Sequence, residues 1–332
     1  MNSKPLLTLF FLAAWAAAPT SLGASWDGEA RDLQFSSPEN WSDNKAPAHK
    51  STRYVLANGD QVTLSQDSKF GRFAMNGGSV LNIVDGFHHR TRPGNRVRDA
   101  YFVGSGGSVN QSGGTYRVGH LLLIGSGDAQ QGGTYNLSDG RLWISREGNT
   151  LLDTRHNAPR ASLQLGDNAS QNTAAMNVSG QASLMTRAGV VIGPTGVFHV
   201  AGSRAMINIG GDREPDGAWT QLAGGTLGFA IGQGGASKIF VHDADETPGV
   251  QVRFDAGTSL ALSFAPNTSP HPGSWVLFEA ENTRFDSSTI AGVTLVTPNG
   301  DSGWSLSYDN INGNGVIVAT YTTGAEMFFE PE

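Results

Sequence analysis

A short motif that recurs along the chain constrains the fold more than any other feature of the sequence. Its form is apolar, any residue, apolar, small, as in residues 101–104 (Tyr-Phe-Val-Gly) and 122–125 (Leu-Leu-Ile-Gly). Further copies end at Ser145, Gly166, Gly193, Gly210 and, loosely, Gly232. The steps between the small residues range from 17 to 27 and centre near 21 residues. Self-similarity at such a spacing indicates stacked supersecondary units rather than a single closed core.

Composition and a second repeated element indicate that these units are built from strands. The chain is rich in Gly (44 residues) and poor in charged residues (15%), which suits short strands joined by tight turns. Gly-Gly-Thr at 113–115, 132–134 and 224–226 accompanies the motif. The leucine-rich repeat consensus is missing, and a propeller needs repeats of about 40 residues or more. We therefore predict an all-β chain folded as a right-handed parallel β-helix (solenoid), with rungs of about 21 residues and a β-rich C-terminal cap.

The sequence divides into three predicted segments. Residues 1–24 read as a secretory signal peptide, because Lys4 precedes an apolar run over 6–18 and small residues follow at 22–24. The run is shorter than the roughly 20 residues of a membrane span. Residues 25–235 form the predicted β-helix with its N-terminal cap, and 236–332 form the last rungs and the β cap. We expect a secreted protein, extracellular or at the cell surface, with the periplasm as an alternative; it has no Cys.

The start of the predicted mature chain resembles a known family. Residues 26–28 (Trp-Asp-Gly) and 40–41 (Asn-Trp), together with the Gly-Gly-Thr copies, resemble secreted bacterial proteins with autotransporter-associated β-strand repeats. This resemblance implies a right-handed parallel β-helix, often displayed on a bacterial surface. The two Trp residues also fit a plain cap over the first rung. Residues 326–332 depart from relatives that carry a sorting signal there.

Two segments that interrupt the repeat carry most of the candidate chemistry. They are 87–101 and 146–160, and from 87 to 160 the chain has nine Arg, no Lys and five acidic residues. Such a local excess of positive charge attracts anions, and Arg suits bidentate binding of carboxylates. For any one of these residues taken alone, the alternative interpretation is a solvent-exposed charge in a loop with no binding role. The candidate catalytic residues are His88, His89, Arg90, Arg98, Tyr101, His120, Arg155 and His156. The candidate substrate-binding residues here are Arg92, Arg96, Trp143 and Arg146.

Counting back six residues from the repeated motif predicts a column of arginines. Arg160, Arg187 and Arg204 occupy this offset on three consecutive repeats, and they complete the candidate substrate-binding set. Unit charges about 5 Å apart repel by about 0.8 kcal/mol per pair in water, so the column needs counter-charges. Acidic side chains of neighbouring rungs and an anionic ligand remain alternative sources of that charge.

An extended face rich in Arg and His suits a long anionic polymer. We expect the protein to bind an extracellular uronic-acid polysaccharide, and a lyase that cleaves it by β-elimination is the leading enzymatic candidate. Some polysaccharide lyases are β-helices, to which the chain is generally similar. Elimination needs a group that neutralises the uronate, a base and an acid, and Arg, His and Tyr supply all three. The alternative is a non-catalytic surface, adhesion or matrix structural protein.

Several other partners are not expected. A net charge of −7 and a pI near 5.6 argue against nucleic acid. No cofactor or metal is predicted, although the acidic segments 212–216 and 243–246 leave Ca²⁺ binding as an alternative to plain turns. The mature chain has no second apolar stretch that would span a membrane. The oligomeric state does not follow from the sequence.

Overall fold

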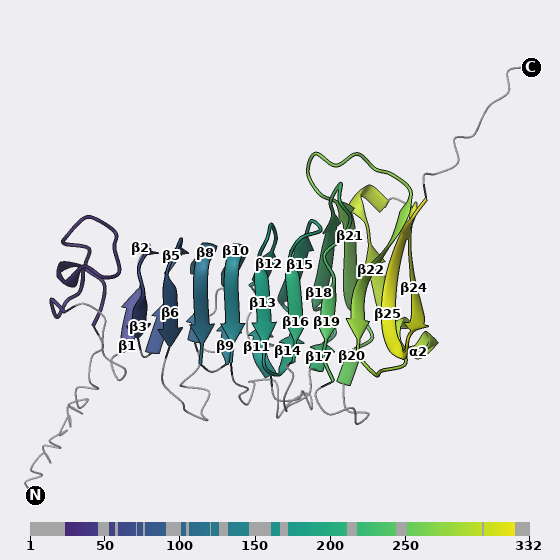
Figure 1. Ribbon diagram of the computed structural model, residues 1–332, viewed down its shortest axis with the longest axis horizontal. Helices are drawn as coiled ribbons and strands as arrows, with labels where there is room; N and C mark the ends of the chain where they lie inside the picture. Colours follow the sequence, from purple (N-terminus) through teal and green to yellow (C-terminus); the bar gives the residue numbers. More distant parts are fainter. Residues whose placement is uncertain are drawn as a thin grey trace, which may run out of the picture.

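A computed structural model describes residues 24–45, 53–56, 59–70, 72–75, 77–90, 101–103, 106–119, 121–125, 132–145, 161–166, 172–210, 218–243, 251–300 and 302–322. These residues form an elongated body of short strands stacked along the long axis (Figure 1). The short helices among them are η1 (Pro38–Asn40), α2 (Ser287–Ile290) and η3 (Pro298–Gly300). The all-β class predicted from the sequence is therefore confirmed. Except for Ala24, the predicted signal peptide lies outside the described residues.

One sheet contains eight strands, and every pairing in it is parallel. Four of the repeated motifs lie in this sheet, in β7, β9, β11 and β14. Its strands, in spatial order, are β1 (Arg53–Leu56), β4 (Arg72–Met75), β7 (Tyr101–Val103), β9 (Leu122–Ile124), β11 (Ala161–Leu165), β14 (Gly189–Ile192), β17 (Ala218–Gln221) and β20 (Gln251–Phe254).

The remaining strands form a larger sheet with two parallel ladders. The first contains β2 (Gln61–Leu64), β5 (Val80–Ile83), β8 (Ser108–Val118), β10 (Thr134–Ile144), β12 (Ala174–Val178), β15 (Gly196–Ala201), β18 (Thr226–Ile231), β21 (Thr258–Phe264) and β23 (Val293–Val296). The second shares β8 and β10 and adds β3 (Ser68–Phe70), β6 (Phe87–Arg90), β13 (Ser183–Thr186), β16 (Met206–Ile209), β19 (Ile239–Val241) and β22 (Gly273–Ala280). Antiparallel β25 (Asn314–Tyr321) and β24 (Trp304–Ile311) follow β22.

The predicted fold class, a right-handed parallel β-helix with a β-rich cap, is wrong. The larger sheet is mixed and curves into a nearly closed barrel shape, beside the smaller parallel sheet. The physical reason lies in β8 and β10, which are 11 residues long and belong to both ladders. Both strands run from one ladder into the other without a break, so the two ladders form one continuous curved sheet.

The predicted rung of about 21 residues is also not maintained. In the eight-stranded sheet, Leu165 pairs with Ile124, 41 residues before it, and with Ile192, 27 residues after it. The motif copies in β10, β16 and β18 lie in the larger sheet, whereas the other copies lie in the smaller one. The motif thus marks any short buried strand, and its spacing does not measure one structural period. Parallel pairing nevertheless continues past residue 235, as far as β23.

The core lies between the two sheets, and alternation along β8 and β10 places side chains inside or outside it. In β10, Leu142 and Ile144 are fully buried while Trp143 between them is partly exposed. The middle strands of the smaller sheet are different, because β11, β14 and β17 are buried at every position. Parallel sheets covered on both faces carry such continuous apolar runs.

Aromatic clusters lie at both ends of the body. At the amino-terminal end, Trp41 is fully buried and contacts Trp26, Phe35 and Tyr54 with ring centroids 5.0–5.3 Å apart. The Trp41 Nε1–H donates to the carbonyl of Phe35 at 3.0 Å, which satisfies the buried indole. This cluster rests on β1 and covers the first strands of both sheets.

Candidate functional site

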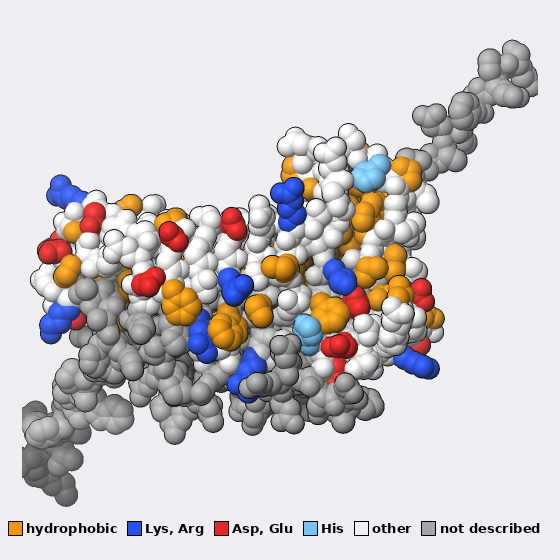
Figure 2. Space-filling model, in the orientation of Figure 1, with side chains coloured by type: hydrophobic (Ala, Val, Ile, Leu, Met, Phe, Trp, Pro, Cys, Tyr) orange, Lys and Arg blue, Asp and Glu red, His pale blue; other side chains and the backbone are white. Residues whose placement is uncertain are grey.

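The strongest candidate site is the outer surface of the second ladder of the larger sheet. Strand alternation buries Tyr116 and Leu142 while their neighbours Arg117 and Trp143 face outward. We call this surface the aromatic–basic face and define it by Phe87, Arg117, Arg141, Trp143, Met185, Arg187, Met206, Lys238, Phe240 and His242. Figure 2 shows orange and blue side chains in a row along this face.

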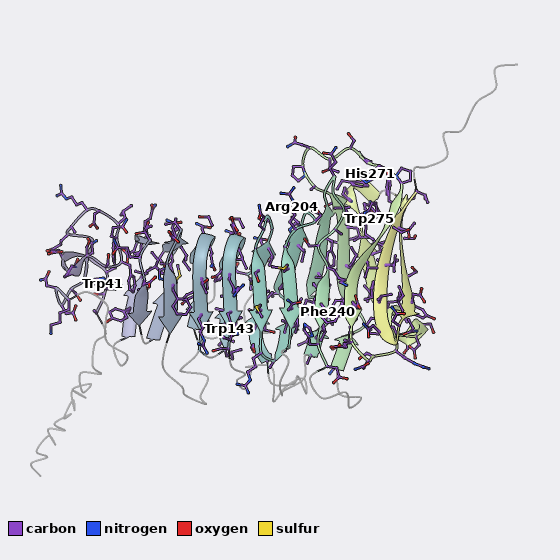
Figure 3. All side chains as sticks on the ribbon, viewed as in Figure 1. Trp41, Trp143, Arg204, Phe240, His271 and Trp275 are labelled. Atoms are coloured by element: carbon purple, nitrogen blue, oxygen red, sulfur yellow. The ribbon has the colours of Figure 1, made fainter. Side chains whose placement is uncertain are left out.

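The register of the ladder stacks these side chains in columns along the long axis. The central column consists of the paired positions Arg117, Trp143, Met185, Asn208, Phe240 and Glu279. Figure 3 labels Trp143 and Phe240 on the same side of the body. A column two residues upstream includes the exposed Arg141 and Met206. Since neighbouring strands lie about 4.8 Å apart, the central column runs about 19 Å from β8 to β19.

Arg117 and Trp143 form the centre of this face. The guanidinium carbon of Arg117 lies 4.2 Å from the Trp143 ring centroid, which is the geometry of a cation–π contact. The Arg117 Nε is buried and has no hydrogen-bond partner in the described structure. Within the part of the chain that the structure describes, no carboxylate pairs with Arg117 or Arg141. Neither guanidinium is therefore neutralised by a carboxylate of the described residues.

The carboxyl-terminal part of the face is charge-balanced. Lys238 pairs with Glu279 and lies 5.4 Å above the Phe240 ring. Partial burial acts to raise the pKa of Glu279, but hydrogen bonds from Lys238 and Asn314 and the Lys238 charge outweigh it, so this pKa lies below its usual value. His242 contacts Phe240 edge-on at 4.5 Å, and its Nδ1 is 3.5 Å from Glu281. Among the described residues, Lys238 of this face thus has a carboxylate partner, whereas Arg117 and Arg141 do not.

His88, a predicted catalytic residue, is placed in the interior. It lies in β6, its side chain is fully buried, and its Nδ1 accepts from the Ser68 hydroxyl at 2.8 Å. Its Nε2–H donates to the carbonyl of Asp85 at 2.6 Å. Desolvation lowers the pKa of His88, outweighing that bond and the nearby carboxylates. Both ring nitrogens are engaged in a neutral imidazole, so His88 stabilises the fold and does not face a substrate.

Most other predicted site residues cannot be placed. His89, Arg90 and Tyr101 lie in strands β6 and β7, but their side chains are outside the described part of the structure. The predicted site residues outside the described residues altogether are Arg92, Arg96, Arg98, His120, Arg146, Arg155, His156 and Arg160. The acidic segment 212–216 also lies outside them. The two predicted inserts follow β6 and β10, whose carboxyl ends belong to the same ladder as the aromatic–basic face.

The structure does not stack Arg187 on Arg204. Arg187 follows β13 and its N–H donates to the carbonyl of Ile144, on the aromatic–basic face. Arg204 lies two residues before β16, and Met206 pairs with Ser183. The two arginines therefore lie at opposite ends of neighbouring strands, and Figure 3 shows Arg204 at the opposite edge from Trp143. The arginine column fails here because the counted motifs belong to different ladders.

Sequence reasoning identified Trp143 and Arg187 but missed most of the face. Strand alternation was the available signal. Each missed residue lies next to a buried residue in β6, β8, β10, β13, β16 or β19, or immediately precedes or follows such a strand. The residues missed in this way are Phe87, Arg117, Arg141, Met185, Met206, Lys238, Phe240 and His242.

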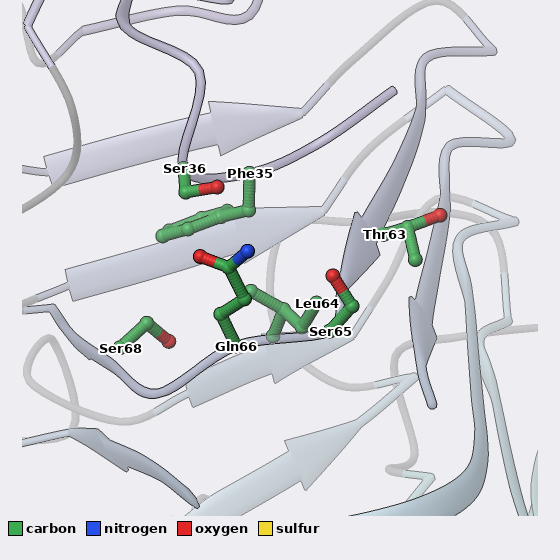
Figure 4. Close-up of a pocket in the computed structure, with 7 residues that line it drawn as sticks. All are labelled: Phe35, Ser36, Thr63, Leu64, Ser65, Gln66 and Ser68. Carbon is green, nitrogen blue, oxygen red and sulfur yellow. The ribbon is translucent and has the colours of Figure 1, made fainter. Parts of the chain in front are cut away.

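Other places in the described structure offer less chemistry. A cavity near the amino-terminal end holds about 10 Å³, roughly the space of one water (Figure 4). It is lined by Phe35, Ser36, Thr63, Leu64, Ser65, Gln66 and Ser68. No group of three or more His, Asp or Glu side chains suited to a metal occurs among the described residues. In that same part of the chain, none of the helices has the length and apolar character needed to cross a membrane.

Comparison with protein families and with curated sequences identifies no relative. No protein-family model matches the chain, and no curated protein sequence matches it significantly. The resemblance to autotransporter-associated repeat proteins thus stays a prediction.

Proposed function

We propose that this protein is exported and binds an extended anionic polysaccharide of the uronic-acid class along its aromatic–basic face. The observation that carries this proposal is the Arg117–Trp143 stack, the first two members of an outward column of aligned side chains. Aromatic faces offer flat apolar contact area to sugar rings, and guanidinium groups bind carboxylates bidentately. Trp143 and Phe240 lie in the same column, which runs along the long axis, the direction in which a linear polymer would lie.

The length of the face supports a polymer rather than a small ligand. Its central column extends about 19 Å over five strands, while a small-molecule site is a concave cavity. Exposed apolar side chains add contact area at both ends of the upstream column, since Phe87 is 39% and Met206 is 56% exposed. The exported location follows from the predicted signal peptide and stays part of the proposal.

Cleavage by β-elimination is the second candidate function. It is favoured by the positions of β6 and β10, because the two Arg- and His-rich segments of the sequence follow these strands of the face. Against it, the described histidine that was predicted as catalytic, His88, is buried and fully hydrogen-bonded. Binding therefore has the better support.

A polymer panel tests binding and cleavage together. The mature protein would be run by affinity electrophoresis through gels containing polygalacturonate, alginate or hyaluronan, with a neutral glucan as the control. We expect retardation by acidic polymers that weakens as salt rises, because exposed charge pairs are screened. Ultraviolet absorbance of unsaturated uronate ends is recorded in parallel, and a rise would favour the lyase. Retardation by none of the acidic polymers at low salt would contradict the proposal.

A further inference from the structure

A second cavity lies at the edge opposite the aromatic–basic face, near the carboxyl-terminal end. It has a volume of about 320 Å³, which falls in the range of small-molecule sites. It lies between the turn at 232–235 after β18 and the connection from β21 to β22. Its lining consists of Gln233, Asn267, Thr268, Ser269 and His271. Figure 3 labels His271 at this edge, above Trp275.

Backbone hydrogen bonds fix both walls of this cavity. In the first wall, Gly232 and Gly235 exchange two N–H···O bonds of 2.8 and 2.9 Å, which hold Gln233 at the tip of a tight turn. In the second, the Thr268 N–H donates to the carbonyl of Ala265 at 3.0 Å, and Asn267 adopts a φ of +66°. Because these turns close on themselves, the lining side chains are presented by a preformed scaffold.

Two aromatic rings pack against His271, one of the lining residues. The His271 ring is 5.5 Å from Phe264 and 5.7 Å from Trp275, both of which are partly buried. Its Nδ1–H donates to the carbonyl of Ser269 at 3.0 Å, which orients the ring and leaves Nε2 as an acceptor. A methyl group built on Gly273 would lie 2.6 Å from the Trp275 ring, so that ring is seated directly over the glycine.

The chemistry of the lining indicates the class of ligand. Two amides, two hydroxyls and one imidazole provide both donors and acceptors, and none of the five lining side chains is a carboxylate, a guanidinium or an ammonium. A ring with several hydroxyl groups and an apolar face matches such a lining beside aromatic rings. We propose that this cavity binds one neutral pyranose unit, separately from the anionic polymer on the aromatic–basic face.

The test uses the full mature protein and the methyl glycosides of glucose, galactose and mannose, at about 1–10 mM. Binding is followed by amide and indole NMR shifts, which report Gln233, His271 and Trp275 individually. The variants are Gln233→Ala and Asn267→Gly, the latter chosen because Gly accepts the positive φ. We expect at least one glycoside to shift these signals and each variant to weaken its binding about tenfold or more.

The control is Arg253→Ala in β20 of the smaller sheet, which lies outside both proposed binding surfaces and should leave the glycoside affinity unchanged. Three results would each overturn the inference: no shift of the cavity signals with any glycoside, unchanged affinity in both cavity variants, or loss of binding in Arg253→Ala alone. Since the acidic polymers are measured separately, failure of this inference does not affect the proposed function.

Discussion

One buried and one partly buried histidine show how single residues couple this fold to pH. His88 and His199 both have pKa values below the usual value of about 6.5, in each case mainly because burial disfavours the imidazolium. The His199 ring lies over Gly228, where a Cβ would come within 2.8 Å of it. The folded chain therefore binds fewer protons than the unfolded chain just below neutrality.

We expect the contribution of these histidines to the free energy of unfolding to be greatest above about pH 6.5. This contribution should fall as the pH decreases toward their lowered pKa values. Urea unfolding between pH 7.5 and 5 measures this slope. His88→Gln, which keeps a donor and an acceptor but does not titrate, should flatten it. An equal slope in the variant and the wild-type protein would show that His88 is not the source.

Two glycines with similar backbone angles allow the cost of backbone strain to be measured apart from the cost of steric contact. Gly140 has φ +75°, and a Cβ there would lie 2.4 Å from the carbonyl oxygen of Gly114. Gly202 has φ +82°, with no atom within 4 Å of its Cβ position. We expect Gly202→Ala to cost about 1 kcal/mol and Gly140→Ala about 3 kcal/mol or more, measured by urea unfolding. Equal losses would mean that the corner formed by β10 has room to move.

At the scale of elements, a ladder of asparagines joins four neighbouring strands. The side-chain amide of each Asn donates to the Oδ1 of the preceding one at 3.1, 2.9 and 2.8 Å, in the order Asn82, Asn110, Asn136 and Asn177. The strands β5, β8, β10 and β12 carry these residues in register on the outer surface. These side-chain hydrogen bonds therefore help to fix the register of the strands in the first parallel ladder of the larger sheet.

Position in the asparagine ladder should determine the cost of removing a member. Asn136→Ala removes two hydrogen bonds and is expected to cost about 1–2 kcal/mol, whereas the terminal Asn82→Ala removes one and is expected to cost about 0.5–1 kcal/mol. The free energies come from urea unfolding of each single variant and of the double variant. If both single losses were equal, the amide bonds would not act as a connected ladder.

The long strands β8 and β10 determine the curvature that the sequence did not reveal. Register shifts occur in their pairing between Leu137 and Asp139 and between Asp139 and Arg141. Gly114 and Gly140 adopt positive φ at the corner, so the strands bend without losing their pairing. Each strand thereby contributes to both ladders and carries Arg117 or Trp143 on its second half.

For the molecule as a whole, the sequence predicted the all-β class and parallel neighbours but not the way the sheets close. Alternation and Gly-rich turns are local signals, and they identified strands such as β9, β14 and β16. Whether a chain breaks or bends between two strands depends on a few corner residues, such as Gly140, whose conformation a repeat pattern does not specify. The connections between strands also differ in length, for example between β9 and β11, so the spacing of the motif did not give the structural period.

The candidate site was predictable only in part for a related reason. Trp143 stood out by its residue type, but Arg117 becomes meaningful only once the register places it against that ring. His88 attracted attention by type and proved to be interior. Composition thus pointed to an Arg-rich region, while the pairing of strands determines which of its side chains share a surface.

The most direct test of the account is the affinity of the double variant Arg117→Ala/Trp143→Ala for polygalacturonate, measured by isothermal titration calorimetry. The control is Arg253→Ala, which removes the same charge from β20 of the smaller sheet, where Arg253 pairs with Asp255. Both variants should unfold near the wild-type midpoint, because these side chains are partly exposed. We predict at least about tenfold weaker binding for the double variant, from loss of the stack and of one carboxylate contact, and wild-type binding for the control. Wild-type affinity in the double variant, or an equal loss in the control, would contradict the proposed role of the aromatic–basic face.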